Sequence, residues 1–191
     1  MKFNSLLSVG LTIVILTIFS SCDKKEKEDP IIPNEEELIT SLYFTLIDTL
    51  ANDTVLFSFK DLDGDGGNDP EIINGELQAN TNYIGKIGLY NESVDPRENI
   101  TIEIQNEADH HQFFFIVSTA LNFQIEYNDS DSNGNPLGIE NTIETGEGSV
   151  GELLIILRHN PNKTAAGVSE GIITNAGGES DIEVTFELTI L

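Results

Sequence analysis

Cysteine, tryptophan and basic residues are scarce in this chain of 191 residues, which has one cysteine, no tryptophan and nine basic against 33 acidic residues. A single cysteine excludes an internal disulfide framework, so a folded domain must rely on its core and sheets. The formal net charge of −24 argues against nucleic acid and anionic lipid headgroups as partners, since both require clustered Lys and Arg. The lack of tryptophan argues against a module that stacks on sugar rings.

Signatures of catalysis are also scarce. The chain has no HExxH metalloprotease motif, and its one cysteine lies in the leader region rather than in a folded domain. Carboxylate pairs are abundant, but in so acidic a chain they do not single out a glycosidase pair. The sequence therefore predicts a protein that is not an enzyme.

Residues 1–21 have the three parts of a secretory signal peptide: Lys2, an apolar stretch from Leu6 to Phe19, and a small-residue exit at Ser20-Ser21. The stretch has 14 residues, including two threonines, a serine and a glycine, and a membrane span needs about 20 apolar residues. Cleavage before Cys22 removes one lysine and no acid, which leaves eight basic against 33 acidic residues and a net charge of −25.

Phe19-Ser20-Ser21-Cys22 resembles the lipobox of bacterial lipoproteins, with phenylalanine in place of the usual leucine. The resemblance implies lipid on Cys22, and two or three acyl chains hold a protein stably on a membrane. Residues 22–37 are charged and contain two prolines, which predicts an extended tether. Acidic residues behind the cysteine resemble surface-export signals of Bacteroidota lipoproteins. They imply an outer-membrane lipoprotein exposed at the cell surface, with a periplasm-facing one as the alternative.

Residues 38–191 are predicted to form a single domain in which apolar and polar residues alternate repeatedly. The alternating segments are 42–46, 55–59, 83–89, 113–117, 123–127, 153–157 and 182–190. Turn residues separate them, and no helical period is sustained. This pattern predicts an all-β fold, an antiparallel, immunoglobulin-like β-sandwich of about seven to nine strands, with a closed β-barrel as the alternative.

Residues 100–105 fit two structures. Ile100-Thr101-Ile102-Glu103-Ile104-Gln105 alternates like a strand, whereas Ile100, Ile104 and Ala108 also fit one face of a helix. The β-branched content favours a strand over the short helix.

Two aspartate-rich stretches predict calcium sites. Asp61, Asp63, Asp65 and Asp69 lie in a stretch that resembles the first half of a calcium-binding loop, with Gly66 at the sixth position. The twelfth position is Ile72 rather than glutamate. The alternative is a Gly/Asp turn between two strands.

The second stretch, from Asp129 to Glu140, matches the spacing of a full twelve-residue calcium loop through Asp129, Asp131, Asn133 and Glu140. Its strand-like flanks argue against a helix-loop-helix hand, and Pro136 would redirect the last ligand. A turn without metal is again the alternative.

The three histidines are expected to be structural. His110 and His111 are adjacent, so on a strand they point to opposite faces and cannot easily bind one ion together, and His159 is also read as a residue at a strand end. Asp48-Thr49-Leu50 and Asp53-Thr54-Val55 resemble short O-glycosylation sequons, with Thr49 and Thr54 as the acceptors.

Several stretches together resemble a family of small Bacteroidota lipoproteins, namely the Ser-Ser-Cys leader, residues 59–67, 111–115 and 158–163. The resemblance covers nearly the whole chain and implies no activity. Some members are described as having a "type 1 periplasmic binding fold", a two-lobed α/β architecture that differs from the β pattern of this chain. We expect a non-enzymatic envelope lipoprotein with a structural or adhesive role and an unidentified protein or glycan partner. The alternative is a ligand- or glycan-binding accessory subunit of an outer-membrane uptake system.

Overall fold

The computed structural model describes residues 37–64 and 66–191. The signal peptide, Cys22, the tether up to residue 36, and Asp65 lie outside these residues. No helix in the described ranges is long and apolar enough to cross a membrane. The strands and helices are β1 (Ser41–Asp48), β2 (Thr54–Lys60), β3 (Glu71–Ile73), β4 (Glu76–Leu77), β5 (Asn82–Asn91), β6 (Glu98–Asn99), α1 (Ile100–Asn106), the 3-10 helix η1 (Ala108–His110), β7 (His111–Val117), β8 (Phe123–Tyr127), β9 (Glu140–Thr145), β10 (Ser149–His159), the 3-10 helix η2 (Ile173–Asn175) and β11 (Glu179–Ile190).

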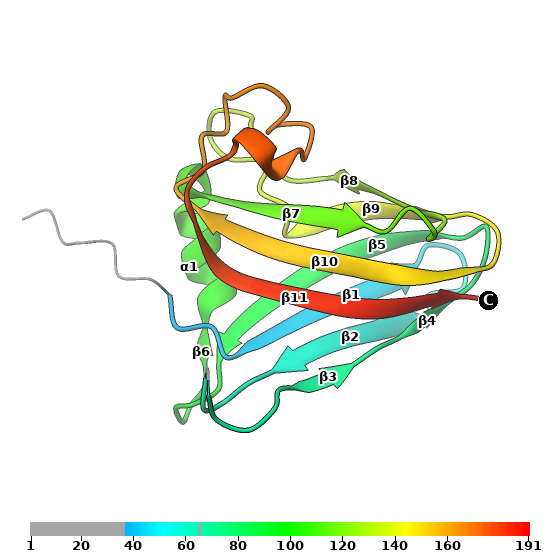
Figure 1. Cartoon of the computed structure of the whole chain (residues 1–191), viewed down its shortest axis with the longest axis horizontal. Helices are drawn as coiled ribbons and strands as arrows, with labels where there is room; N and C mark the ends of the chain where they lie inside the picture. Colours follow the sequence, from blue (N-terminus) through cyan, green and yellow to red (C-terminus); the bar gives the residue numbers. More distant parts are fainter. Residues whose placement is uncertain (1–36, 65) are drawn as a thin grey trace, which may run out of the picture. The chain divides into compact units, whose positions relative to one another are not determined.

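The strands form two stacked sheets, with α1 across one end (Figure 1). The first sheet has the order β3-β2-β1-β5-β9-β8, and β6 also pairs with β5. The second has the order β4-β11-β10-β7. Neighbouring strands are antiparallel except β4 and β11, which are parallel. The predicted sandwich-like, mostly β architecture is therefore confirmed.

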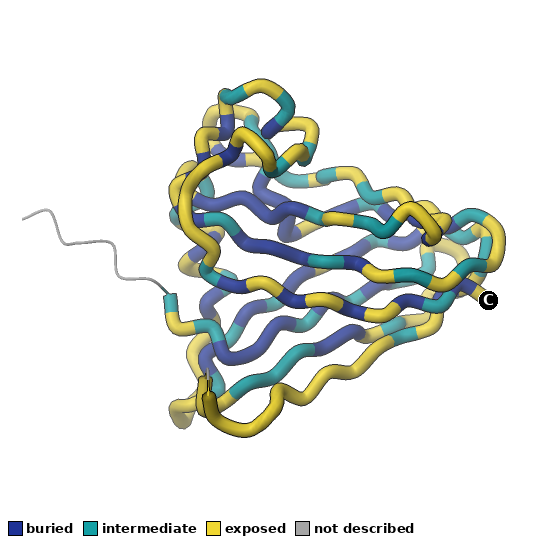
Figure 2. Tube along the Cα trace, in the orientation of Figure 1, coloured by how far each residue is buried: buried dark blue, intermediate teal, exposed yellow. Residues whose placement is uncertain are grey.

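The hydrophobic core fills the space between the sheets. Along β11 buried and exposed residues alternate (Figure 2), as expected for a strand with one face on the core. Phe44 of the first sheet packs on Phe115 of the second, with ring centroids 6.2 Å apart, and Phe57 meets Phe186 edge to face at 5.6 Å. Such aromatic pairs add specific geometry to the burial of apolar area.

The alternative of a closed barrel is wrong, because the described strands divide into two separate sheets. The immunoglobulin-like variant of the sandwich stays a prediction. The strands outnumber the seven to nine expected because β3, β4 and β6 have only two or three residues each, too few for a pattern. The strand β9 was missed because Ile143 is its only apolar residue.

The strand expected over residues 100–105 is wrong, because Ile100–Asn106 is the helix α1. Ile100 and Ile104 are buried on one helical face, while Ile102 is 53% exposed. Burial of two isoleucines against the end of the sandwich outweighs the weak β preference of this segment.

A second, smaller core covers part of the outer face of β7 and β10. Phe114 of β7 and Ile156 of β10 point away from the main core and pack under the loop 160–178, against Val168 and Ala176. Gln112 fixes this loop by donating a hydrogen bond of 2.8 Å from Nε2 to the carbonyl oxygen of Val168.

Ile104→Ala tests the helix. We expect a loss of about 2–5 kcal/mol in the free energy of unfolding, since the side chain is fully buried. The matched control Ile102→Ala should change stability by less than about 0.5 kcal/mol. Urea denaturation measures both. A strand would place residues 102 and 104 on the same face, so equal losses would contradict the helix.

Candidate metal centre

Four side chains from distant parts of the sequence converge at one end of the sandwich: Glu37, His111, His159 and Asp181. Each offers one ligand atom, and these atoms all lie within 4.8 Å of one another. The side chains are at most 7% exposed. Glu37 precedes β1, His111 begins β7, His159 ends β10, and Asp181 lies near the start of β11.

The two histidines meet because β7 and β10 are paired. In the antiparallel register His159 lies directly opposite His111. Directly opposed residues point to the same face of a sheet. The inward-facing Phe113 and Leu157 show that this face is the core side. The imidazole ring centroids are 4.7 Å apart.

A shift in register turns Asp181 into the same space. Leu157 pairs with Ile182 and Arg158 with Ser180, so Asp181 is the extra residue of β11 at this point. Without the shift, Asp181 would share the outer face with Glu183, because alternate residues of a strand share a face. Gly178 allows the chain before β11 to pass close to the backbone of His159. A Cβ at position 178 would lie 2.1 Å from the carbonyl oxygen of His159, and the φ of Gly178 is +71°. Irregularities of this kind commonly redirect a functional side chain.

The tautomer of His111 follows from its second contact. Its Nδ1 lies 3.1 Å from the carbonyl oxygen of Glu107, just after α1. A carbonyl oxygen only accepts, so Nδ1 carries the hydrogen and Nε2 presents its lone pair to the carboxylates. This is the usual way in which a metal-binding histidine is oriented. Burial lowers the pKa of His111, although the Glu107 carbonyl opposes that shift, so the neutral ring is favoured.

Within the described residues, His111 Nε2 and Glu37 Oε2 are buried and have no hydrogen-bond partner. Buried polar atoms are nearly always paired, so these two atoms require an explanation. Because Nε2 of the neutral ring cannot donate, it faces the acceptor oxygen Oε1 of Glu37 at 3.4 Å with no proton between them. A cation placed between them would satisfy both.

The spacing between His111 and Glu37 fits a metal ion better than a hydrogen bond. His111 Nε2 is 3.4 Å from Glu37 Oε1, and the ligand atoms of all four side chains lie within 4.8 Å of one another. Charged hydrogen bonds are shorter, about 2.7–2.9 Å. Ligands of tetrahedral zinc lie about 3.3 Å apart, because Zn–N and Zn–O bonds are about 2.0–2.1 Å long. The Glu37, His111, His159 and Asp181 group could thus hold a metal ion.

Sequence reasoning missed this group. His110 and His111 were both expected on a strand, but His110 ends η1 and only His111 lies in β7. His110 is exposed, and its Nδ1 lies 2.9 Å from Asn160 Oδ1. Reading His111 and His159 as isolated residues at strand ends was the error. Each histidine lies two positions from an apolar residue of its strand, at His111-x-Phe113 and Leu157-x-His159, so alternation places each on the inward face of that strand. This pattern could have predicted that both histidines point into the core.

The first aspartate stretch is an exposed turn. Asp61 Oδ1 accepts the backbone N–H of Gly64 at 2.8 Å. Asp63 Oδ2 accepts hydrogen bonds from the backbone and side chain of Asn68, at 3.2 and 2.6 Å, and these lower the pKa of Asp63. Asp69 is also exposed. Calcium at this stretch stays a prediction.

The structure does not bring the carboxylates of the second aspartate stretch together. Asp129 accepts backbone N–H groups from Gly138, Ile139 and Glu140. Glu140 pairs instead with Lys86, at 3.0 Å, and Asn133 is exposed.

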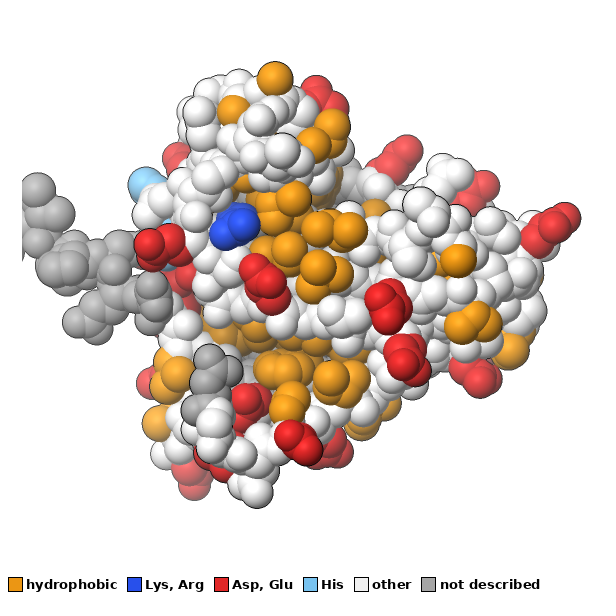
Figure 3. Space-filling model, in the orientation of Figure 1, with side chains coloured by type: hydrophobic (Ala, Val, Ile, Leu, Met, Phe, Trp, Pro, Cys, Tyr) orange, Lys and Arg blue, Asp and Glu red, His pale blue; other side chains and the backbone are white. Residues whose placement is uncertain are grey.

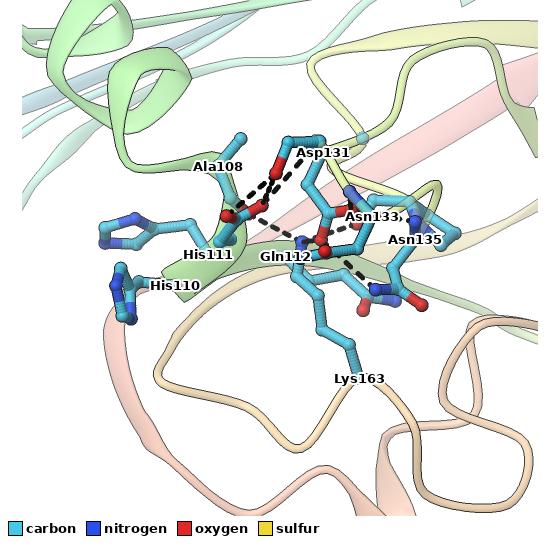
Figure 4. Close-up of polar contacts among 12 residues, drawn as sticks. Ala108, His110, His111, Gln112, Asp131, Asn133, Asn135 and Lys163 are labelled. Atoms are coloured by element: carbon cyan, nitrogen blue, oxygen red, sulfur yellow. Dashed lines mark hydrogen bonds and ion pairs between the residues drawn. The ribbon is translucent and has the colours of Figure 1, made fainter.

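Asp131, in the same stretch, pairs with a lysine. Lys163 Nζ lies 3.1 Å from Asp131 Oδ2 and also donates to the carbonyl oxygens of Ala108 and Pro136 (Figure 4). Burial lowers the pKa of Lys163, although Asp131 opposes that shift. The lysine ammonium therefore already supplies a cation beside Asp131.

Two further sites lie on the surface. Thr49 and Thr54 are exposed, and the Thr49 hydroxyl donates to the carbonyl oxygen of Asn82 at 3.1 Å; their glycosylation stays a prediction. Gly167-Val168-Ser169-Glu170-Gly171 has the Gly-x-Ser-x-Gly spacing of a hydrolase nucleophile, which our sequence reasoning overlooked. It lies in turns, not between a strand and a helix as a nucleophile elbow does.

The chain matches no family model, no curated protein and no solved structure.

Lys163→Met tests the role of the buried lysine. It leaves the Asp131 carboxylate buried without its counter-charge, so we expect a loss of about 3–5 kcal/mol in the free energy of unfolding. Adding Asp131→Asn should recover part of that loss. Urea denaturation of the three proteins gives the values, and a single variant within about 1 kcal/mol of wild type would refute the role.

Proposed function

We propose that the protein is a non-enzymatic cell-envelope lipoprotein whose β-sandwich binds one zinc ion through Glu37, His111, His159 and Asp181. The observation that carries the proposal is that His111 Nε2 and Glu37 Oε2 are buried without a hydrogen bond, while His111 Nε2 lies 3.4 Å from the other carboxylate oxygen of Glu37. Lipid on Cys22 would attach the chain to the outer membrane at the cell surface, as the leader predicts.

The ligand types favour a transition-metal ion over calcium or magnesium. Imidazole nitrogen suits zinc and its neighbours in the first transition series, whereas calcium and magnesium take oxygen ligands. An imidazole binds a metal in its neutral form, so two carboxylate and two imidazole ligands would carry a charge of −2, which a divalent ion balances. A neutral centre is less costly to bury than separate charges.

The closed ligand set supports a structural role. Catalytic zinc sites keep one position open for water or substrate, while structural sites fill all four with protein ligands. Here four protein side chains each offer one ligand atom, and none of these side chains is more than 7% exposed. Zinc would join the segment before β1 to three strands of the other sheet. Force from a membrane anchor at Cys22 enters the domain through that same segment.

Zinc and Glu37→Gln should have opposite effects on stability. Zinc at a hundred times its Kd should stabilise the chelator-treated full chain by about 2.7 kcal/mol, seen as a raised Tm. Glu37→Gln should weaken zinc binding at least about 100-fold. In chelator, however, the same variant should match or exceed the wild-type Tm, because it removes one of two crowded carboxylates.

Titration calorimetry and thermal melts in detergent measure both effects. The matched control is His110→Gln, an exposed histidine beside the centre, which should bind zinc as wild type does. If Glu37→Gln instead lowered the Tm in chelator and zinc changed nothing, the group would be an ion-pair network and the zinc proposal would fail.

Calcium at the first aspartate stretch is a separate proposal, and it rests on the spacing of Asp61, Asp63, Asp65 and Asp69. Calcium at ten times its Kd should add about 1.4 kcal/mol, with constants of about 10⁻⁴–10⁻³ M for extracellular modules. Asp63→Asn should abolish the rise in Tm but leave zinc binding intact. Identical melts of the wild type in chelator and in millimolar calcium would rule this site out.

A further inference from the structure

One side of β11 has no neighbouring strand along most of its length. β11 pairs with β10 from Glu179 to Ile190, but on its other side β4 pairs only with Thr189 and Ile190. The backbone N–H of Leu191 donates to Leu77 on that side, and that of Glu187 donates to the Asn74 side chain. Since alternate residues point the same way, the N–H groups of Glu183 and Thr185 also point to this open side. The described chain places no strand beside them.

The open side of β11 borders an apolar cleft. A cavity of about 600 Å³ lies between the start of β11 and the end of β2, lined among others by Ile39, Phe59, Leu62 and Ile182. Figure 3 shows hydrophobic side chains gathered in the region between β11 and β2. Ile72 of β3, opposite Phe59 in the register, shares its inward face yet is 43% exposed. The second sheet therefore does not extend far enough to cover the edge of the first.

Acidic residues surround this opening. Glu183 and Glu187 alternate with the buried residues of β11 on its outer face, Glu71 lies on β3, and Asp61 and Asp63 line the cleft. Two copies of the chain joined edge to edge along β11 would bring Glu183 and Glu187 near the same residues of the other copy. Like charges opposed across a sheet are destabilising, so these residues disfavour self-pairing.

We propose that the open side of β11 binds an extended segment of a partner protein by β-strand addition, and that this segment alternates apolar residues with lysine or arginine. The backbone of the segment pairs with Glu183 and Thr185. Its apolar side chains cover Phe59, Ile72 and Ile182, and its basic side chains face Glu183 and Glu187. Main-chain hydrogen bonds supply affinity in this mode, and the alternating side chains supply specificity.

A synthetic nine-residue peptide of alternating valine and lysine, blocked at both ends, is the probe. Fluorescence anisotropy with the full chain in detergent measures its Kd, against a valine–glutamate peptide of the same length. We expect at least tenfold tighter binding of the lysine peptide, and slower amide exchange at Glu183 and Thr185 when it is bound. Equal binding of both peptides, or no binding of either, would overturn the proposal.

Thr185→Pro separates strand addition from attraction by charge alone. Proline removes an N–H that points away from β10, so the native pairing is kept, and proline is tolerated at such edges. The variant should bind the lysine peptide at least tenfold more weakly, whereas Thr185→Val should stay within twofold of wild type. If Thr185→Pro folds and binds the lysine peptide as wild type does, the proposal is contradicted. It is also contradicted if the wild type is a dimer and Thr185→Pro is a monomer, because a second copy of the chain would then occupy the open side of β11.

A charge-reversed protein covers the case in which Thr185→Pro does not fold. Glu183→Lys with Glu187→Lys keeps the backbone and should invert the preference, so that the valine–glutamate peptide binds more tightly than the valine–lysine one. If the lysine peptide remained the better ligand, the acidic face of β11 would not select the partner, and the proposal would fail.

Discussion

The register between β7 and β10 is the constraint on which the candidate metal centre depends. It sets His159 opposite His111 on the core side of the sheet. The shift between β10 and β11 then turns Asp181 toward the same space, and the segment before β1 brings Glu37 from the other sheet. A slip of one residue in β10 would point His159 away from the core, because side chains alternate between faces. The candidate metal centre therefore forms only with this pairing of the strands of the second sheet.

The main strands could be predicted from the sequence, because each places several apolar residues on one face. The segments around Phe44, Phe57 and Val184 have this period and form β1, β2 and β11. Residues 100–106 could not be assigned in the same way. Ile100, Ile102 and Ile104 suit a strand locally, and only contact with the end of the sandwich selects the helix. The two-residue strands depend entirely on their neighbours and leave no pattern.

The metal-ligand group was harder to predict than the aspartate stretches, although its geometry is more specific. Calcium loops are recognised by local spacing, and Asp129–Glu140 has that spacing, yet Lys86, Lys163 and backbone N–H groups satisfy its carboxylates. Glu37, His111, His159 and Asp181 are single residues separated by many positions. His111 and His159 could have been paired through their inward period, but Asp181 reaches the centre only through an irregularity in the ladder.

X-ray absorption at the zinc edge, on the zinc-loaded full chain, tests the metal centre most directly. The proposed zinc site would give four nitrogen or oxygen ligands at about 2.0–2.1 Å, with the scattering signature of two imidazoles. His159→Gln should remove one imidazole from that signature, and His110→Gln should leave the spectrum unchanged. A shell of six oxygens without imidazole, or a chain that retains no zinc, would contradict the account.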